Sequence, residues 1–269
     1  MQKKYGQNFL IDSNVIEGIV DAAGITKDDC VLEIGPGMGA MTGYLLEAAR
    51  KVIAVEVDKM LIPILNDVLK GYDNLVLIND DILKVDIGKL IDEENDGRPI
   101  KVVANLPYYI TTPIVMQLLE KEEKIESITV MVQKEVAQRM QDGPGTKSYG
   151  SLSLAVQYYS KPELVLKVSK NCFVPKPSVD SAVIRMDVYK PYERPVKVRD
   201  EEQMFAIIRA AFNQRRKMLV NAIENAPNLD YTKMDVANAL TEMRLPLMIR
   251  GEALTLNDFA RLSDILSLQ

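Results

Sequence analysis

The chain has 269 residues, 47% hydrophobic and 26% charged, a balance typical of one large globular domain or of one large and one small domain. It contains no histidine and only two cysteines, which excludes Ser-His-Asp and Cys-His catalysis and a four-cysteine zinc site, so no metal is expected. The net charge of −5 argues against general nucleic-acid binding but allows local basic patches. No segment resembles a signal peptide or reaches the roughly 20 apolar residues of a membrane span, so a cytoplasmic location is expected.

Short apolar runs alternate with helical patterns through the first 189 residues. The runs cover residues 30–35, 51–57, 75–79, 100–106, 127–132, 164–168 and 181–189. Near-continuous Val, Ile and Leu in runs separated by helices is typical of a parallel sheet covered on both faces. The last two runs are joined without a helical pattern, so they are expected to pair antiparallel at the sheet edge. Residues 1–189 are therefore predicted to form an α/β domain with a seven-stranded, mostly parallel, doubly wound sheet.

A proline-containing linker, residues 190–199, ends this alternation. Beyond it, helical spacing recurs in segments 200–212, 214–226, 233–243 and 256–267. Asp200 and Asn257 are expected helix N-caps, as is Thr112 in the first domain ahead of a first-turn proline. Residues 190–269 are therefore predicted to form a small all-helical C-terminal domain.

The segment "EIGPGMGA" (33–40) follows the first run and opens a helix. Its glycines, Gly35 and Gly37 among them, allow the backbone to turn tightly and to approach a ligand, although a tight turn alone is the simpler alternative. Glu56 ends the second run, where a carboxylate can bind ribose hydroxyls. Taken alone, this pattern fits NAD and S-adenosylmethionine almost equally.

Two further carboxylates favour S-adenosylmethionine. Asp81 ends the third run, where it can accept from an adenine amine, although a turn aspartate is an ordinary alternative. Glu33 precedes the glycines. Dinucleotide sites use such a loop for a pyrophosphate, whereas a site surrounded by carboxylates suits a cationic sulfonium.

The segment "NLPYYITTP" (105–113) is an unusually aromatic loop between a strand and a helix. The Asn105 side-chain oxygen and the Leu106 carbonyl can accept from the exocyclic amine of a base and direct its lone pair. Pro107 stiffens the turn and removes a donor. Tyr108 offers a face for stacking, worth about 1–3 kcal/mol per base. Holding amine and methyl donor in line can supply up to about 7–11 kcal/mol of the barrier reduction, so the loop predicts amine methylation without histidine or metal.

Two other features have a functional and a structural interpretation. Phe173, ahead of two prolines, is either a second wall that sandwiches an extruded base against Tyr108 or a buried aromatic of a hairpin connection. Between residues 203 and 223 there are four basic and no acidic residues. This cluster, an RNA contact or a solvated helix face, consists of Arg209, Arg215, Arg216 and Lys217.

Six segments together resemble the KsgA/RsmA family of small-subunit ribosomal RNA adenine dimethyltransferases. They are "GQNFLID" (6–12), "EIGPGMG" (33–39), "NLPYYITTP" (105–113), "SYGSLSLAVQYY" (148–159), "FVPKPSVDSAV" (173–183) and "AAFNQRRKMLVNAI" (210–223). The resemblance runs from residue 3 to the C-terminus in the family's order and spacing. It implies a class I, Rossmann-like methyltransferase that dimethylates the N6 amine of two adjacent adenosines near the 3′ end of small-subunit rRNA, leaving S-adenosylhomocysteine as the product of the donor.

The resemblance also assigns roles by position. The segment that covers the cofactor corresponds to Gln7, Asn8 and Leu10, the glycine loop to Gly35, the ribose carboxylate to Glu56 with Val57 beside it, and the adenine-binding pair to Asp81 and Ile82. The catalytic motif corresponds to Asn105, Leu106, Pro107 and Tyr108, and Asn105 is also a cofactor-binding position. Tyr109 departs from the asparagine of many members. The implied partner is a ribosomal precursor particle, and a monomer is the default expectation.

Other functions remain open at this stage. Erm-type methyltransferases of large-subunit rRNA share the fold and a similar loop, although the Leu106 form and the "FNQRRKML" segment favour the small-subunit family. A non-catalytic assembly factor would need no amine-orienting loop. A NAD-dependent oxidoreductase would be distinguished by the ligand that raises the melting temperature.

Overall fold

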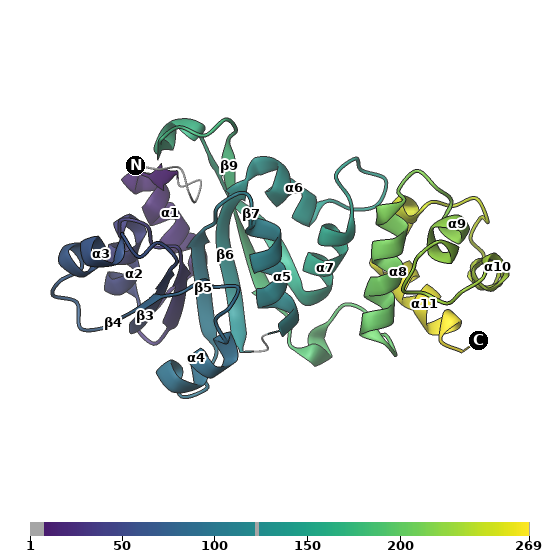
Figure 1. Cartoon of the computed structure of the whole chain (residues 1–269), viewed down its shortest axis with the longest axis horizontal. Coiled ribbons are helices and arrows are strands. Elements are labelled where there is room, and N and C mark those ends of the chain that lie inside the picture. The colour runs from purple at the N-terminus through teal and green to yellow at the C-terminus, as the bar shows by residue number, and fades with distance from the viewer. Residues whose placement is uncertain (1–7, 122–123, 269) are drawn as a thin grey trace. The chain divides into compact units, whose positions relative to one another are not determined.

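The structure is a computed structural model and describes residues 8–121 and 124–268. Within this part of the chain, seven strands form one sheet in the order β4-β3-β2-β5-β6-β9-β7 (Figure 1). The strands are β2 (Cys30–Ile34), β3 (Lys51–Glu56), β4 (Leu75–Asn79), β5 (Ile100–Asn105), β6 (Ile125–Gln133), β7 (Ser160–Val168) and β9 (Ser181–Val188). The first five pair in parallel, and β9 is antiparallel to both of its neighbours. The predicted sheet is confirmed, including the antiparallel pair at its edge.

Strand order reverses between β2 and β5, which pair directly with each other. In doubly wound sheets this reversal is where ligands bind, beyond the carboxyl ends of the strands. Both strands are buried almost throughout because helices cover both faces.

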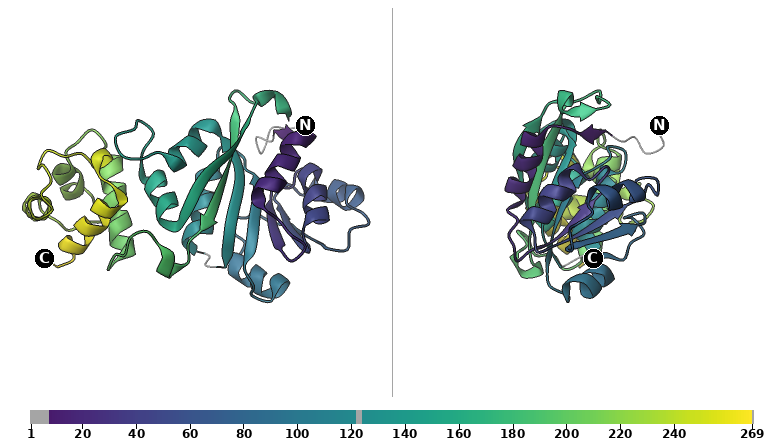
Figure 2. Two further views of the ribbon diagram at one scale, coloured as in Figure 1. Left: turned by 180° about the vertical axis from the view of Figure 1, so that it is seen from behind. Right: turned by 90° about the vertical axis from the view of Figure 1, so that its left-hand side faces the viewer.

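The covering helices are α1 (Ser13–Ala23), α2 (Ala40–Ala48), α3 (Ile62–Val68), α4 (Ile87–Asn95) and α5 (Thr111–Lys121). Helix α1 precedes the first strand of the sheet, and the other covering helices alternate with the strands. Figures 1 and 2 show α5 in front of the sheet in one view and α1 in front of it from behind. One core cluster joins α1, α2 and α3 to their face of the sheet, with Ile19, Leu45 and Leu65 fully buried. No helix in the described residues is long and apolar enough to cross a membrane.

A small antiparallel pair lies outside the main sheet. Strand β1 (Phe9–Leu10) pairs with β8 (Phe173–Val174), so that Leu10 lies opposite Phe173. Ile11 N–H extends the pairing by donating to the carbonyl of Cys172 at 2.9 Å. This clasp was not predicted, since two-residue strands carry no periodicity.

The chain divides into two compact units, of which the second comprises residues 139–158 and 191–269. Its helices are α7 (Ser151–Tyr159), α8 (Glu201–Asn213), α9 (Leu219–Glu224), α10 (Lys233–Glu242) and α11 (Leu256–Leu266). Edge-to-face contacts join Tyr149 to Phe212 and Tyr158 to Phe205, and Tyr149 Oη donates to the carbonyl of Leu254 at 2.9 Å. The sequence placed the border at residues 189 and 190, whereas the packing groups 139–158 with the C-terminal helices.

Helix starts differ from the sequence expectation in two places. Asp200 caps α8 as expected, accepting from Gln203 N–H at 2.9 Å. Asn257 was the wrong choice for α11, because Thr255 caps that helix and Asp258 reciprocates in a capping box.

Thr112 was also the wrong cap, since α5 begins one residue earlier, at Thr111. The turn closed by Ile110 N–H on the carbonyl of Pro107, at 3.2 Å, continues directly into that helix. The predicted helix over 214–226 is shortened as well, because residues 214–217 form a turn closed by Lys217 N–H on the carbonyl of Gln214 at 2.8 Å.

Candidate active site

The loop between β2 and α2 has a left-handed backbone at its glycines. Gly35, Gly37 and Gly39 have φ angles of 70°, 61° and 84°, a region that residues with a side chain rarely adopt. A Cβ on Gly37 would lie 3.4 Å from the ring of Phe9. The loop therefore places bare backbone next to the N-terminal segment.

Glu56, at the end of β3, holds this loop with its carboxylate. Its Oε2 accepts from Gly37 N–H at 3.1 Å and its Oε1 from Asp58 N–H at 2.8 Å. Burial raises the pKa of Glu56, and the backbone hydrogen bonds offset part of the rise. Each oxygen has a further lone pair, so the carboxylate can still accept from a hydroxyl group.

Glu33, on β2, is a fully buried carboxyl. The residue is 0% exposed, and among the described residues neither of its oxygens has a partner, nor does the hydroxyl of nearby Thr42. Burial, together with the charge of Glu56, raises the pKa of Glu33 to about 8, and the proximity of Thr42 offsets only part of this. Near neutral pH, Glu33 therefore holds a proton unless a cation approaches it.

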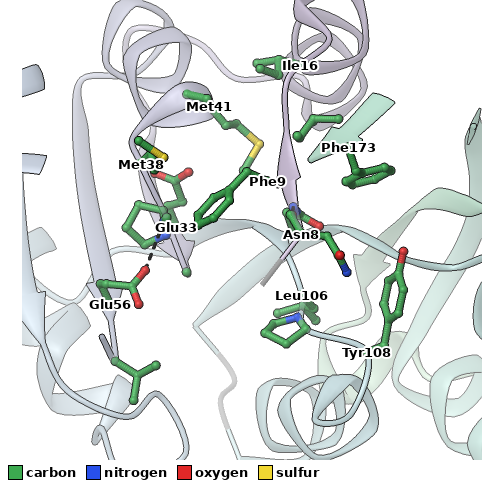
Figure 3. Close-up of a pocket in the computed structure, with 18 of the residues that line it drawn as sticks. Asn8, Phe9, Ile16, Glu33, Met38, Met41, Glu56, Leu106, Tyr108 and Phe173 are labelled. Atoms are coloured by element: carbon green, nitrogen blue, oxygen red, sulfur yellow. Dashed lines mark hydrogen bonds between the residues drawn. The ribbon is translucent and has the colours of Figure 1, made fainter. Parts of the chain in front are cut away.

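These groups border a cavity of about 360 Å³ at the carboxyl ends of β2, β3 and β5. Figure 3 shows Glu33 and Glu56 on one side of it and Tyr108 and Phe173 on the other. The predicted site residues that line it are Asn8, Leu10, Gly35, Gly37, Glu56, Val57, Asn105, Leu106, Pro107, Tyr108 and Phe173. The fold thus brings together segments that are up to 165 residues apart, since 173 − 8 = 165.

Hydrogen bonds to backbone groups of the loop after β5 hold this loop in place. Leu106 N–H donates to the carbonyl of Met131 at 3.1 Å, and the Pro107 carbonyl accepts from Thr111 Oγ1 at 3.1 Å. The Asn105 amide nitrogen donates to the carbonyl of Asn8 at 3.4 Å. Because the nitrogen is used in this way, the amide oxygen is the atom of that side chain suited to accept from a ligand.

Of the predicted cofactor residues, Asp81 and Ile82 do not line the cavity. Gln7 lies outside the described residues. Asp81 follows β4, and its Oδ1 accepts from Leu83 N–H at 3.1 Å, while Ile82 is buried at 6% exposure. The adenine-binding role of Asp81 and Ile82 stays a prediction.

Several residues that line the cavity were not predicted from the sequence to do so. Phe9, Ile16, Met38 and Met41 supply apolar walls, and Tyr109 lines the cavity although it is 61% exposed. Phe9 lies inside the segment "GQNFLID", but nothing in that segment indicates that its ring lines the cavity. Ile16 and Met41 follow ordinary helical spacing and could not have been distinguished from core residues.

The predicted basic cluster belongs to the second unit and is not uniform. Arg209, Arg216 and Lys217 are exposed. Arg215 instead forms an ion pair with Glu252 at 2.8 Å and donates to the carbonyl of Thr146 at 3.1 Å. Arg215 therefore joins two segments of its own unit, and this part of the prediction is qualified by the structure.

The strand order, the glycine loop and the adjoining cavity define a Rossmann-like methyltransferase domain. Two solved structures resemble the chain along nearly its whole length. A dimethyladenosine transferase from Plasmodium falciparum matches with a TM-score of 0.77 and 25% identity, covering 94% of this chain and 95% of that one. The 23S rRNA methyltransferase ErmE matches with a TM-score of 0.72 and 27% identity, covering 97% and 100%.

The sequence comparisons are more specific. Residues 1–260 match the model of the ribosomal RNA adenine dimethylase family. A protein named ribosomal RNA small subunit methyltransferase A from Lachnoclostridium phytofermentans is 59% identical over 98% of this chain and 91% of its own length. One of the same name from Bacillus pumilus is 49% identical over 98% and 91%. The chain therefore belongs to the ribosomal RNA adenine dimethylase family.

Proposed function

We propose that this chain transfers methyl groups from S-adenosylmethionine to the N6 amines of two adjacent adenosines near the 3′ end of small-subunit rRNA. The product is N6,N6-dimethyladenosine, formed on a precursor particle during small-subunit biogenesis. One observation carries the proposal: the Asn105–Tyr108 loop lines the same cavity as the glycine loop and Glu56. Family membership and the small-subunit names of its relatives support the substrate.

The residues of the cavity fit S-adenosylmethionine. The glycines of the loop leave room for a ligand, and Glu56 can accept from ribose hydroxyls. Glu33 offers a buried carboxylate to a cationic group, which would supply the partner that its oxygens lack in the described structure. When bound, the cofactor supplies a methyl group on a sulfonium.

Asn105 and Leu106 prepare the amine. The amide nitrogen of Asn105 is directed to Asn8, so its oxygen can accept one N–H of the target amine while the Leu106 carbonyl accepts the other. The lone pair is then directed out of conjugation with the ring. No strong base is needed, because the methylated amine loses its proton readily, and orientation supplies much of the rate.

Tyr108 and Phe173 receive the base. Both line the cavity, and an enzyme that acts on a base must first unstack it. Phe173 is only 3% exposed, so its contribution is the inner wall, whereas the half-buried Tyr108 offers the accessible face.

The second unit is proposed to bind RNA phosphates through Arg209, Arg216 and Lys217, whose side chains are exposed. Arg215 supports the same surface by holding the segment that contains Thr146. The protein is proposed to act as a monomer in the cytoplasm, where its ribosomal substrate is assembled.

The test is a methylation assay with small subunits that lack this modification. Purified protein and S-adenosylmethionine are expected to produce dimethyladenosine, detected by mass spectrometry of the digested RNA, while large subunits stay unmodified. Absence of dimethyladenosine in small subunits would overturn the proposal. Modification of large subunits instead would indicate the Erm-type activity, which the likeness to ErmE makes the second candidate.

Two measurements separate the remaining alternatives. S-adenosylmethionine, and not NAD, is expected to raise the melting temperature. A non-catalytic assembly factor would bind subunits and leave their RNA unmethylated.

A further inference from the structure

The ring of Tyr108 is held at its hydroxyl end. Tyr108 Oη and Ser181 Oγ are 2.7 Å apart, a hydrogen bond in which either atom can donate. Tyr108 is half-buried and lines the cavity, whereas Ser181 is 1% exposed and does not line it. Ser181 therefore contacts the candidate site through Tyr108.

Strand pairing on both sides holds Ser181 in position. It is the first residue of β9 and pairs with Gln133 of β6 on one side and Val168 of β7 on the other. The residue before it is also fixed, because the Asp180 carbonyl accepts from Lys134 N–H at 3.1 Å and its Oδ1 from Lys170 N–H at 3.0 Å. A hydroxyl group at this position has little freedom to move.

The other end of the ring is fixed by the catalytic loop. The carbonyl of Pro107, directly before Tyr108, accepts from Ile110 N–H and Thr111 Oγ1. The Oη atom lies on the long axis of the ring, so anchoring it to Ser181 and the backbone to the loop fixes the direction of that axis. The ring can still rotate about the axis and match its face to a base.

We propose that Ser181 is a positioning residue for the target base, acting through the hydroxyl of Tyr108. This inference rests on the proposed function. A base stacks well only on a ring of defined direction, and the same nitrogen must stay in place for two successive transfers. Loss of the Ser181 hydroxyl therefore weakens the hold on the base and favours its release after one methyl group.

The chain offers a matched control, Ser127. It is also a serine at 1% exposure, on β6 opposite Asp187 of β9, and its hydroxyl has no hydrogen-bond partner among the described residues. Ser127→Ala removes a buried hydroxyl from the same pair of strands without touching the site.

The experiment compares Ser181→Ala, Tyr108→Phe, the double variant and Ser127→Ala. The first two are expected to raise the KM for small subunits roughly 3- to 10-fold, the effect of losing one neutral hydrogen bond, and to increase the ratio of monomethyl- to dimethyladenosine. The double variant is expected to be no worse than the more affected single variant, because both remove the same bond. Binding of S-adenosylmethionine, measured by calorimetry, and all parameters of Ser127→Ala are expected to stay within twofold of wild type.

The inference is overturned if Ser181→Ala matches Ser127→Ala in KM and product ratio, or if the effects of the single variants multiply. A purely structural role would lower the melting temperature of Ser181→Ala without changing either quantity. If Ser181→Ala does not fold, Tyr108→Phe decides alone, and a wild-type KM and product ratio there overturn the inference. Failure of the wild-type protein to methylate small subunits would instead count against the proposed function.

Discussion

The protonated state of Glu33 leads to a sharp prediction for Glu33→Gln. The side chain is 0% exposed with a pKa of about 8, against an ordinary value of 4.5. At pH values between 4.5 and 8, Glu33 keeps its proton in the folded protein and loses it in the unfolded chain. The free energy of unfolding therefore falls as pH rises, by about 1.4 kcal/mol per pH unit from this residue. Between pH 5 and pH 8 the loss amounts to about 4 kcal/mol.

Glu33→Gln removes this dependence, because an amide does not titrate in that range. The amide also leaves buried N–H groups without partners, at a cost of about 1–3 kcal/mol that is the same at every pH. The readout is therefore the slope of the free energy of unfolding against pH. Relative to wild type, Glu33→Gln is expected to gain about 4 kcal/mol of stability between pH 5 and pH 8.

The assay is equilibrium unfolding in urea at several pH values, followed by circular dichroism because the chain has no tryptophan. Parallel pH profiles for wild type and Glu33→Gln would refute the reasoning, since they would show that Glu33 titrates normally in the folded protein. Asp67→Asn, which removes an exposed carboxyl on α3, serves as the control.

Three further predictions concern the catalytic loop, the basic cluster and the division into units. Asn105→Ala is expected to keep the stabilisation by S-adenosylmethionine and to lower kcat on the order of 100-fold, and an unchanged kcat would remove its assigned role. Arg216→Ala combined with Lys217→Ala is expected to reduce the slope of log Kd against log salt for subunit binding by about 2, one for each lost phosphate contact; an unchanged slope would leave these side chains on a solvated face. Arg215→Ala, by contrast, is expected to lower the melting temperature slightly with little change in slope, because it leaves Glu252 unpaired. A chain ending at Tyr189 is expected to give little soluble protein, because α7 loses the aromatic residues of α8 that cover it, and a cooperatively unfolding fragment would contradict this.

The sheet could be predicted because its strands are long enough to show continuous apolar runs. Each run corresponds to a strand, and the missing helix before β9 indicated the antiparallel edge. The pairing of β1 with β8 could not be predicted in this way, because each strand has two residues and the two lie near opposite ends of the sequence of the first unit. The cap of α11 was misplaced because Thr255 and Asp258 satisfy two donors together, which outweighs a single asparagine.

The lining of the cavity could be predicted where a motif carries it, as in the glycine loop and Asn105–Tyr108. Contacts between residues far apart in the sequence could not be predicted. Ser181 contacts Tyr108 across 73 positions of sequence, and Arg215 is neutralised by Glu252, 37 positions away. The placement of residues 139–158 was not predicted for the same reason, since they join the second unit through aromatic packing and not through any change in composition.

The clasp between β1 and β8 has a consequence for synthesis of the protein on the ribosome. Residues 9 and 10 leave the ribosome long before their pairing partners, residues 173 and 174. The cavity wall made by the N-terminal segment can therefore form only after most of the first unit has been translated. A nascent chain that already contains the glycine loop and Glu56 still lacks this wall, so the complete cavity can form only once residues 173 and 174 have been translated.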